Sequence, residues 1–361
     1  MTALGQPLVT VLTPVYNGAD FLADCIESVL TQTYQHYEYI IVNNRSTDRT
    51  LEIALDYAKK DRRIRVVDNE QFVPVIENHN IAFRLVSAEA KYCKVVSADD
   101  FLFPTAIARM VALAEANPSV GIVGSYQLSG DRVLWQGFKF PRAVFSGVEM
   151  CRRVFLGGDR GFGFGSPTSM LYRADLVRSD SAFYPNPSPH SDTSACFRAL
   201  RHADYGFVYD VLSFERTHGE TQSSASAAMN RYSSANLDDA ISYGPWYLNQ
   251  EELARRLDDV LKSYHRFLAV NYFCASRGKD FWSYHKGRLE ELGYPLSRAS
   301  LYKAAILALI SEALNPAQAI RKLKNVGRPV SRTSPAAPTE TTQAGAAGRT
   351  TGLPTSGEGH A

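Results

Sequence analysis

The chain has 361 residues, of which 45% are hydrophobic and 21% are charged, and these values are ordinary for a folded globular protein. Its formal net charge is +2 with Lys and Arg dispersed, so we expect no nucleic-acid partner. The five cysteines lack CxxC spacing, which argues against a disulfide framework or a zinc site and indicates a reducing compartment. No signal peptide or run of about 20 apolar residues is present, so we expect a cytoplasmic location.

From residue 8 to residue 128, short β-rich runs alternate with segments of helical periodicity. The expected strands are 8–13, 37–42, 64–68, 92–97 and 120–125. The expected helices are 21–30, 47–60, 75–87 and a segment that starts at 104. This alternation predicts an α/β fold with a mainly parallel sheet, and ligands in such sheets bind at the carboxyl ends of the strands.

The rest of the chain changes character along its length. Residues 129–235 are less regular and contain Gly and Pro clusters, and residues 236–326 are mainly helical. Residues 327–361 contain too little apolar surface to fold, so we expect a disordered tail. The basic stretch 303–326 has two interpretations, because it can pack on the domain or lie on a membrane surface.

The strongest local signal is SADDFLFP, residues 97–104, where two adjacent carboxylates follow an apolar strand. Asp99 and Asp100 repel each other there, and a hard divalent cation that also binds substrate phosphates would compensate. The alternative is a solvated strand end in which an aspartate caps the next helix. The pair alone does not decide between these interpretations.

Four motifs, PVYNG, VNNRSTD, ENHN and SADDFLFP, follow one another in this order. In this order they resemble the motifs of the family 2 glycosyltransferases, which have the GT-A fold, over roughly residues 8–218. The resemblance implies that Thr13 and Tyr16 lie beside the nucleotide of a nucleotide-sugar donor. It also implies a divalent metal, Mg²⁺ or Mn²⁺, with Asp100 as its ligand, while Asp99 faces the ribose or the metal.

The sequence departs from the family pattern at two places. Asn43 and Asn44 stand where the family usually has two aspartates, and Ser97 stands where many members have another aspartate. The second aspartate typically accepts a hydrogen bond from the base. Asn44 keeps an acceptor oxygen and adds an NH₂ donor, which favours a UDP- or dTDP-type donor over a guanine nucleotide.

Further site residues follow from the resemblance in the second half of the matched region. Asp192, in PHSDTSACF, stands where the family has its catalytic base, although it also fits an ordinary helix N-cap. Arg216 and His218, in FERTHGE, are expected at the diphosphate and at the metal respectively, although a lone loop histidine is also common on surfaces. Phe162 and Phe164 fit either a sugar-stacking surface or the core.

Together these observations predict a metal-dependent, inverting glycosyltransferase that acts on a hydroxyl of a glycan or lipid-linked acceptor. Residues 1–128 would bind the nucleotide sugar and residues 129–235 the acceptor, and the helices of 236–326 offer a peripheral contact with the inner face of a membrane. The first alternative is a non-catalytic binding protein of the same fold. A nucleotidyltransferase fits less well, because TPVYNG lacks the Gly-rich basic loop of those enzymes.

Overall fold

The computed structural model describes residues 5–157, 161–185, 188–216, 229–274 and 277–314. Residues up to Ala308 belong to one compact unit, and a second unit from Leu309 to Ala361 contributes only the end of the last helix to the described residues. His218 and the expected tail, 327–361, lie outside the described residues. The expected boundaries between the four regions of the chain stay a prediction.

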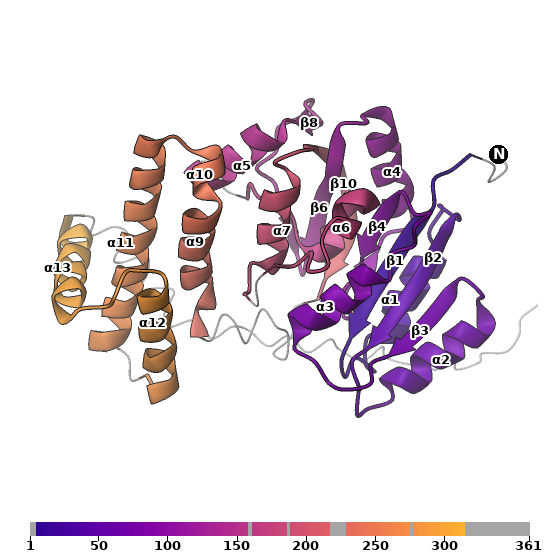
Figure 1. Cartoon of the computed structure of the whole chain (residues 1–361), viewed down its shortest axis with the longest axis horizontal. Helices are drawn as coiled ribbons and strands as arrows, with labels where there is room; N and C mark the ends of the chain where they lie inside the picture. The colour runs from indigo at the N-terminus through magenta and orange to yellow at the C-terminus, as the bar shows by residue number, and fades with distance from the viewer. Residues whose placement is uncertain (1–4, 158–160, 186–187, 217–228, 275–276, 315–361) are drawn as a thin grey trace, which may run out of the picture. The chain divides into compact units, whose positions relative to one another are not determined.

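A sheet of ten strands forms the centre of the first unit, with the path β3-β2-β1-β4-β9-β6-β10-β5 (Figure 1). Strand β7 pairs with β6, and β8 pairs with β10. The strands are β1 Val9–Val15, β2 Tyr37–Asn43, β3 Ile64–Asp68, β4 Tyr92–Val95, β5 Phe101–Leu102, β6 Val120–Ser129, β7 Arg132–Leu134, β8 Val144–Phe145, β9 Met170–Arg173 and β10 Asp204–Glu215.

Strands β1 to β4 pair in parallel, and so do β6 and β10, whereas β9 runs antiparallel to both β4 and β6. The predicted α/β class with a mainly parallel sheet is therefore confirmed. The carboxyl ends of β1, β2 and β4 meet at one edge, as the sequence predicts for the polar clusters that follow them.

Helices cover both faces of the sheet, and each face has its own apolar core. One core packs α1, α2 and α4 against the sheet, and the other packs α3, α5, α6 and α7 against it. These helices are α1 Leu22–Leu30, α2 Thr50–Lys60, α3 Val75–Arg84, α4 Ala106–Ala116, α5 Gly147–Leu156, α6 Ala174–Arg178 and α7 Ser191–Ala199.

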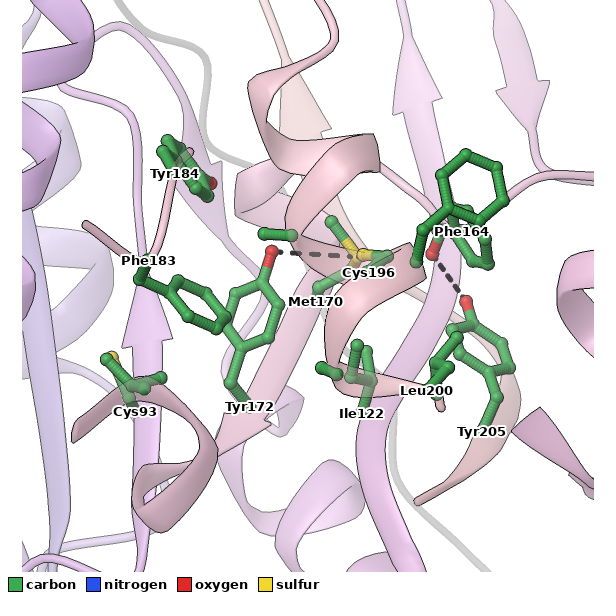
Figure 2. Packing of buried hydrophobic residues seen from close by; sticks show 14 of the residues in the cluster. Cys93, Ile122, Phe164, Met170, Tyr172, Phe183, Tyr184, Cys196, Leu200 and Tyr205 are labelled. Carbon is green, nitrogen blue, oxygen red and sulfur yellow. Dashed lines mark hydrogen bonds between the residues drawn. The ribbon is translucent and has the colours of Figure 1, made fainter. Parts of the chain in front are cut away.

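Figure 2 shows part of the second core, in which Tyr172 of β9 and Cys196 of α7 lie beside Met170. Phe164 is buried there as well, and its carbonyl oxygen accepts a hydrogen bond from the Tyr205 hydroxyl. Phe164 is therefore a core residue, and Phe162 packs against the same core. The sequence left core and sugar-stacking interpretations open, and the packing selects the core.

Strand β1 continues past Pro14, although the sequence suggested that the strand would stop there. Pro14 is aligned with Val42 of β2, whereas the pairing of β1 with β4 ends at Leu12. A proline lacks an N–H and is tolerated where one side of a strand has no neighbour. The apolar strand can therefore extend to Val15 and carry the next loop beyond the edge of β4.

The remaining described helices are α9 Arg231–Ser242, α10 Gly244–Tyr247, α11 Gln250–Cys274, α12 Lys279–Glu291 and α13 Arg298–Leu314. Leu237, Tyr264, Leu268 and Leu289 are buried in a third apolar cluster among them. The Arg152 side chain of α5 binds the Glu252 carboxylate of α11 at 2.6 Å, and so ties these helices to the sheet domain. Among the described helices, none is long and apolar enough to cross a membrane.

Candidate active site

The loop after β1 is fastened to the loop after β2 at the carboxyl edge of the sheet. Asn17 has a left-handed backbone with φ of 49°, and its side-chain oxygen accepts a hydrogen bond from the Thr47 N–H at 2.8 Å. Its own N–H donates to Ser46 Oγ at 2.9 Å, and the Ala19 N–H donates to the Asp48 carboxylate at 3.0 Å. The PVYNG motif therefore shapes this edge through Asn17.

Thr13 and Tyr16, both expected beside a nucleotide, lie in different environments. Thr13 is fully buried, and its hydroxyl oxygen lies 2.9 Å from the Tyr39 hydroxyl oxygen. Tyr16 is 45% exposed, and its ring meets that of Phe72 edge to face with centroids 4.8 Å apart. A ligand at this edge can therefore reach the Tyr16 ring, whereas Thr13 exposes no surface to it.

The Asn44 side chain is buried at the end of β2 and is engaged by protein groups. Its oxygen accepts hydrogen bonds from the Val73 N–H at 3.0 Å and from Asn69 Nδ2 at 3.1 Å. Its Nδ2 donates to the Val73 carbonyl at 2.7 Å. An amide oxygen has two lone pairs, so none remains for the N3–H of a base. The expected base contact of Asn44 therefore requires release from Val73 or Asn69 and stays a prediction.

Asp100 follows β4 and is 6% exposed. Its Oδ2 accepts a hydrogen bond from Thr168 Oγ1 at 2.6 Å, and its Oδ1 accepts one from the Arg216 N–H at 3.1 Å. Burial, followed by the charge of Asp99, raises the pKa of Asp100 to about 7. Each carboxylate oxygen retains acceptor capacity beyond its one protein hydrogen bond, so the carboxylate is set up to bind a cation.

Thr168 and Lys94 fix the position of the Asp100 carboxylate. Thr168 lies in the short 3₁₀ turn Pro167–Ser169, and its hydroxyl accepts a hydrogen bond from the Ser97 N–H at 3.1 Å while it donates to Asp100. The Thr168 carbonyl accepts from Lys94 Nζ at 2.5 Å. Lys94 is fully buried in β4, and burial lowers its pKa to about 7.

The carboxylates after β4 fit a hard divalent cation. Asp99 is half-buried, and Glu215 lies close enough that burial and then the charge of Asp99 raise the pKa of Glu215. Such oxygen donors are the ones that Mg²⁺ and Mn²⁺ prefer. In the part of the chain that the structure describes, no group of three or more His, Cys, Asp or Glu side chains forms a metal site by itself.

Arg216 borders the same carboxylates. Its guanidinium binds the Asp24 carboxylate of α1 at 2.5 Å and lies over the rings of Phe21 and Phe101, at 5.1 and 5.8 Å from their centroids. The structure therefore brings the backbone of Arg216 to Asp100 and its charge to the start of α1. A contact of Arg216 with a diphosphate stays a prediction.

Asp192 lies inside the first turn of α7 and not at its N-cap, which is His190. The alternative interpretation as an ordinary N-cap is therefore corrected. Its Oδ1 accepts a hydrogen bond from the Thr193 N–H at 2.7 Å. Burial raises the pKa of the half-buried Asp192 carboxyl, and the neighbouring His190 opposes this rise. A carboxylate with a raised pKa is a better proton acceptor near neutral pH.

Sequence reasoning missed several residues of this site, namely Lys94, Thr168, His190 and Asp239. Lys94 did have a signal, because a lysine inside the apolar run YCKVVS is buried only with specific partners. Thr168 and Asp239 had none, because each lies far along the chain from the residue that it contacts, which is Asp100 for Thr168 and His190 for Asp239.

The fold defined by this sheet is shared with solved structures of other proteins. The structure of Staphylococcus aureus TarS, residues 1–349, in complex with UDP-GlcNAc matches it with a TM-score of 0.57 and 16% sequence identity. The match covers 82% of this chain and 86% of that chain. At this identity the likeness establishes the fold, which is GT-A-like as the sequence predicted.

Sequence comparison gives a family match. Residues 10–178 match the model of glycosyl transferase family 2, the family whose motifs this sequence resembles. An uncharacterized glycosyltransferase of Haemophilus influenzae is 34% identical over 120 residues, which is 33% of this chain and 36% of the relative. The uncharacterized glycosyltransferase EpsJ of Bacillus subtilis is 38% identical over 128 residues, 35% of this chain and 36% of the relative. The chain thus spans little more than a third of the length of these relatives.

Proposed function

We propose that this protein is a metal-dependent, inverting glycosyltransferase that moves a sugar from a nucleotide-sugar donor to an acceptor hydroxyl. The observation that carries the proposal is the buried Asp100 carboxylate beside Asp99, at the edge of the sheet where β1 and β2 also end. Ionising Asp100 in this position is costly, as its raised pKa indicates, and a bound cation removes that cost. The match of residues 10–178 to the model of glycosyl transferase family 2 supports the same activity.

In this proposal Asp192 takes the proton from the acceptor hydroxyl as that oxygen attacks the anomeric carbon. A single displacement of this kind converts an α-linked donor into a β-linked product. Asp100 holds the cation, with His218 as a further ligand, and Asp99 faces the ribose or the cation. When bound, Mg²⁺ or Mn²⁺ supplies positive charge beside the departing diphosphate. Tyr16 offers its exposed ring to the nucleotide.

The donor proposed is of the UDP or dTDP type. The similarly folded TarS was solved in complexes with UDP and with UDP-GlcNAc, which makes uridine nucleotides the first to test. Asn44 is weaker support for a uridine or thymidine nucleotide than the sequence suggested, because its side-chain oxygen already accepts two hydrogen bonds from the protein. Arg216, which lies between the carboxylates and the start of α1, is the proposed partner of the diphosphate.

The acceptor proposed is a glycan or a lipid-linked glycan, met at the inner face of the membrane. Tyr302, Ile306 and Leu307 support this setting, because they are exposed on one helix, α13, with Lys303 among them. Exposed apolar side chains next to basic ones are typical of helices that lie on a lipid surface. The contact proposed is peripheral.

A non-catalytic binding protein of the same fold is the second candidate. The observation that favours it is the engagement of Asn44, since the family usually has an aspartate there to bind the base. The two candidates differ in one measurable property. A binding protein holds the donor without releasing nucleoside diphosphate, whereas a transferase releases it slowly to water and faster when an acceptor is present.

The test combines binding and turnover on the full chain. UDP-, dTDP- and GDP-sugars are added with Mn²⁺ in a thermal-unfolding assay, and nucleoside diphosphate release is followed in parallel. A ligand at 100 times its Kd adds about 2.7 kcal/mol of stability. We expect UDP- or dTDP-sugars to stabilise the protein and to be hydrolysed. Binding without hydrolysis or transfer would select the second candidate, and absence of any nucleotide binding would refute both.

A further inference from the structure

The helix that carries Asp192 is held at its start by a residue of a much later helix. His190 Nδ1 lies 2.8 Å from Asp239 Oδ2, and the two side chains are 18% and 8% exposed. The other oxygen of the same carboxylate, Oδ1, accepts a hydrogen bond from Ser194 Oγ at 2.9 Å. Asp239 belongs to α9, so one carboxylate of α9 binds α7 on both sides of Asp192 in sequence.

Asp239 changes the ionisation of the His190 imidazole. Burial alone lowers the pKa of His190, but the hydrogen bond and the charge of Asp239 outweigh it, so that the pKa of His190 is raised. The Tyr232 ring of α9 also packs on the imidazole, with centroids 5.5 Å apart. A buried imidazole whose protonated form is favoured by Asp239 therefore lies two residues before Asp192 in the chain.

Two other charged groups near the pair are Asp238 and Arg256. Asp238, the neighbour of Asp239, forms an ion pair with Arg288 of α12. Arg256 of α11 lies near enough to Asp239 to interact with its charge. Facing His190 itself, the charged groups are Asp239 from α9 and Asp192 from its own helix. When His190 is protonated, its charge opposes the effect of burial on the pKa of Asp192.

We propose that His190, held by Asp239, is a positioning residue that orients Asp192 and keeps its carboxylate ionised. In this proposal α9, one of the helices that follow the sheet in the chain, takes part in catalysis, because its Asp239 holds the residue that acts on Asp192. This inference rests on the proposed function in one respect, namely that Asp192 is the base. A structural clamp alone would hold α7 in place but would not change the protonation of Asp192.

The variant His190→Asn separates these two possibilities. It removes the positive charge, and asparagine is among the best residues at an N-cap, which is the position of His190 on α7. The matched control is Tyr247→Phe, which deletes an uncharged hydrogen bond from α10 to the carbonyl of Phe197 in the same helix α7. The control weakens the packing on α7 and leaves the charges near Asp192 unchanged.

The experiment measures kcat and donor KM against pH for wild type, H190N, Y247F and D192N, and the Asp192 carboxyl pKa by NMR. For H190N we expect the acid limb of kcat and the Asp192 pKa to move up by about one unit, because a nearby cation is lost. The kcat at pH 6 to 7 should fall several-fold with an unchanged donor KM. In Y247F both pH-dependent quantities should keep their wild-type values.

The outcomes separate the further inference from the proposed function. If D192N loses turnover and H190N keeps the wild-type acid limb and Asp192 pKa, the pair is a clamp and this inference is wrong. If H190N shifts the Asp192 pKa by NMR but D192N keeps full turnover, the pair acts on Asp192 and the base assignment fails. If H190N does not fold, His190→Gln, which also removes the charge, is measured in its place with the same expected shift.

Discussion

The ends of β2 and β4 lie at the same edge of the sheet and carry polar residues of opposite character. After β2, the Asn44 amide is bonded to Val73 and Asn69 through both its oxygen and its nitrogen. After β4, the Asp100 carboxylate has one protein hydrogen bond on each oxygen and a raised pKa. The Asn44 amide at the end of β2 is hydrogen-bonded through both of its polar atoms without any ligand, whereas the Asp100 carboxylate after β4 is costly to ionise, and the proposed cation would remove that cost.

This difference shows why hydrogen-bond accounting is more informative than residue type at such a site. An asparagine in a motif position that usually binds a nucleotide is used here to hold the segment that contains Val73. A carboxylate whose ionisation is opposed by burial retains capacity for a ligand. Substitutions at the β4 end should therefore change turnover most, and substitutions at the β2 end should mainly change stability.

The largest effect is expected for Asp100→Ala. Removing the carboxylate removes the proposed cation ligand, so transfer should fall below detection and Mn²⁺ should no longer stabilise the protein in thermal unfolding. The control is Asp68→Asn at the end of β3, where the carboxylate already binds Asn43 and Arg45. That variant should keep its response to Mn²⁺. Full activity of the wild type after verified removal of metal would contradict the assignment.

Asp192→Asn comes next. General-base catalysis typically contributes 10²- to 10⁴-fold, so kcat should fall by about that factor, with an unchanged Kd for the donor nucleotide. Asparagine has nearly the same shape, and stability at pH 7 should stay within about 0.5 kcal/mol. A variant with normal melting temperature and near wild-type kcat would eliminate Asp192 as the base.

The same residue predicts a pH dependence. Because burial raises the folded-state pKa of Asp192, the acid limb of kcat should lie above the ordinary range of aspartate, about 3.9. A raised folded pKa favours the folded state below the unfolded pKa, and this contribution is lost as pH rises through the folded pKa. The stability of Asp192→Asn relative to wild type should therefore increase with pH, as measured by urea unfolding between pH 4 and 8.

A smaller effect is expected for Thr168→Val, which keeps the side-chain shape but removes the hydroxyl that joins Asp100 to Ser97. Leaving buried polar groups without a partner costs about 1–3 kcal/mol of stability. The Asp100 carboxylate also loses its orientation, so the Mn²⁺ concentration needed for half-maximal activity should rise by about tenfold. Thr168→Ser keeps the hydroxyl and is the control. Equal Mn²⁺ dependence of the two variants would show that Thr168 does not position Asp100.

Much of the fold was predictable because the apolar runs alternate with helical periodicity, and the order of motifs placed Asp99, Asp100 and Asp192 in their elements. Local pattern did not predict the length of β1, because tolerance of Pro14 depends on where β4 stops pairing. The residues that contact the site from distant parts of the chain could not be predicted for the same reason. Thr168 meets Asp100, and Asp239 meets His190, only through the packing of distant elements, and a single sequence contains no record of such contacts.

Asn44→Asp is expected to change turnover least, and it tests the comparison from the β2 side. This substitution restores the residue type that the family usually has, so a simple motif argument predicts a gain in nucleotide binding. The packing predicts otherwise. The position is 1% exposed, and the new carboxylate oxygen would replace a nitrogen that donates to the Val73 carbonyl at 2.7 Å.

Two oxygens at that distance repel each other, and the buried Val73 carbonyl would lose its donor. We therefore expect Asn44→Asp to lower the free energy of unfolding by about 1–3 kcal/mol, the usual cost of a buried unpaired group. Its kcat and its relative affinity for UDP and GDP should stay within about threefold of wild type, since the side chain faces protein groups. The measurements are urea unfolding and nucleotide titration with Mn²⁺. A changed base preference without loss of stability would show that the Asn44 side chain leaves Val73 and contacts the base. The β2 end would then be a ligand site like the β4 end.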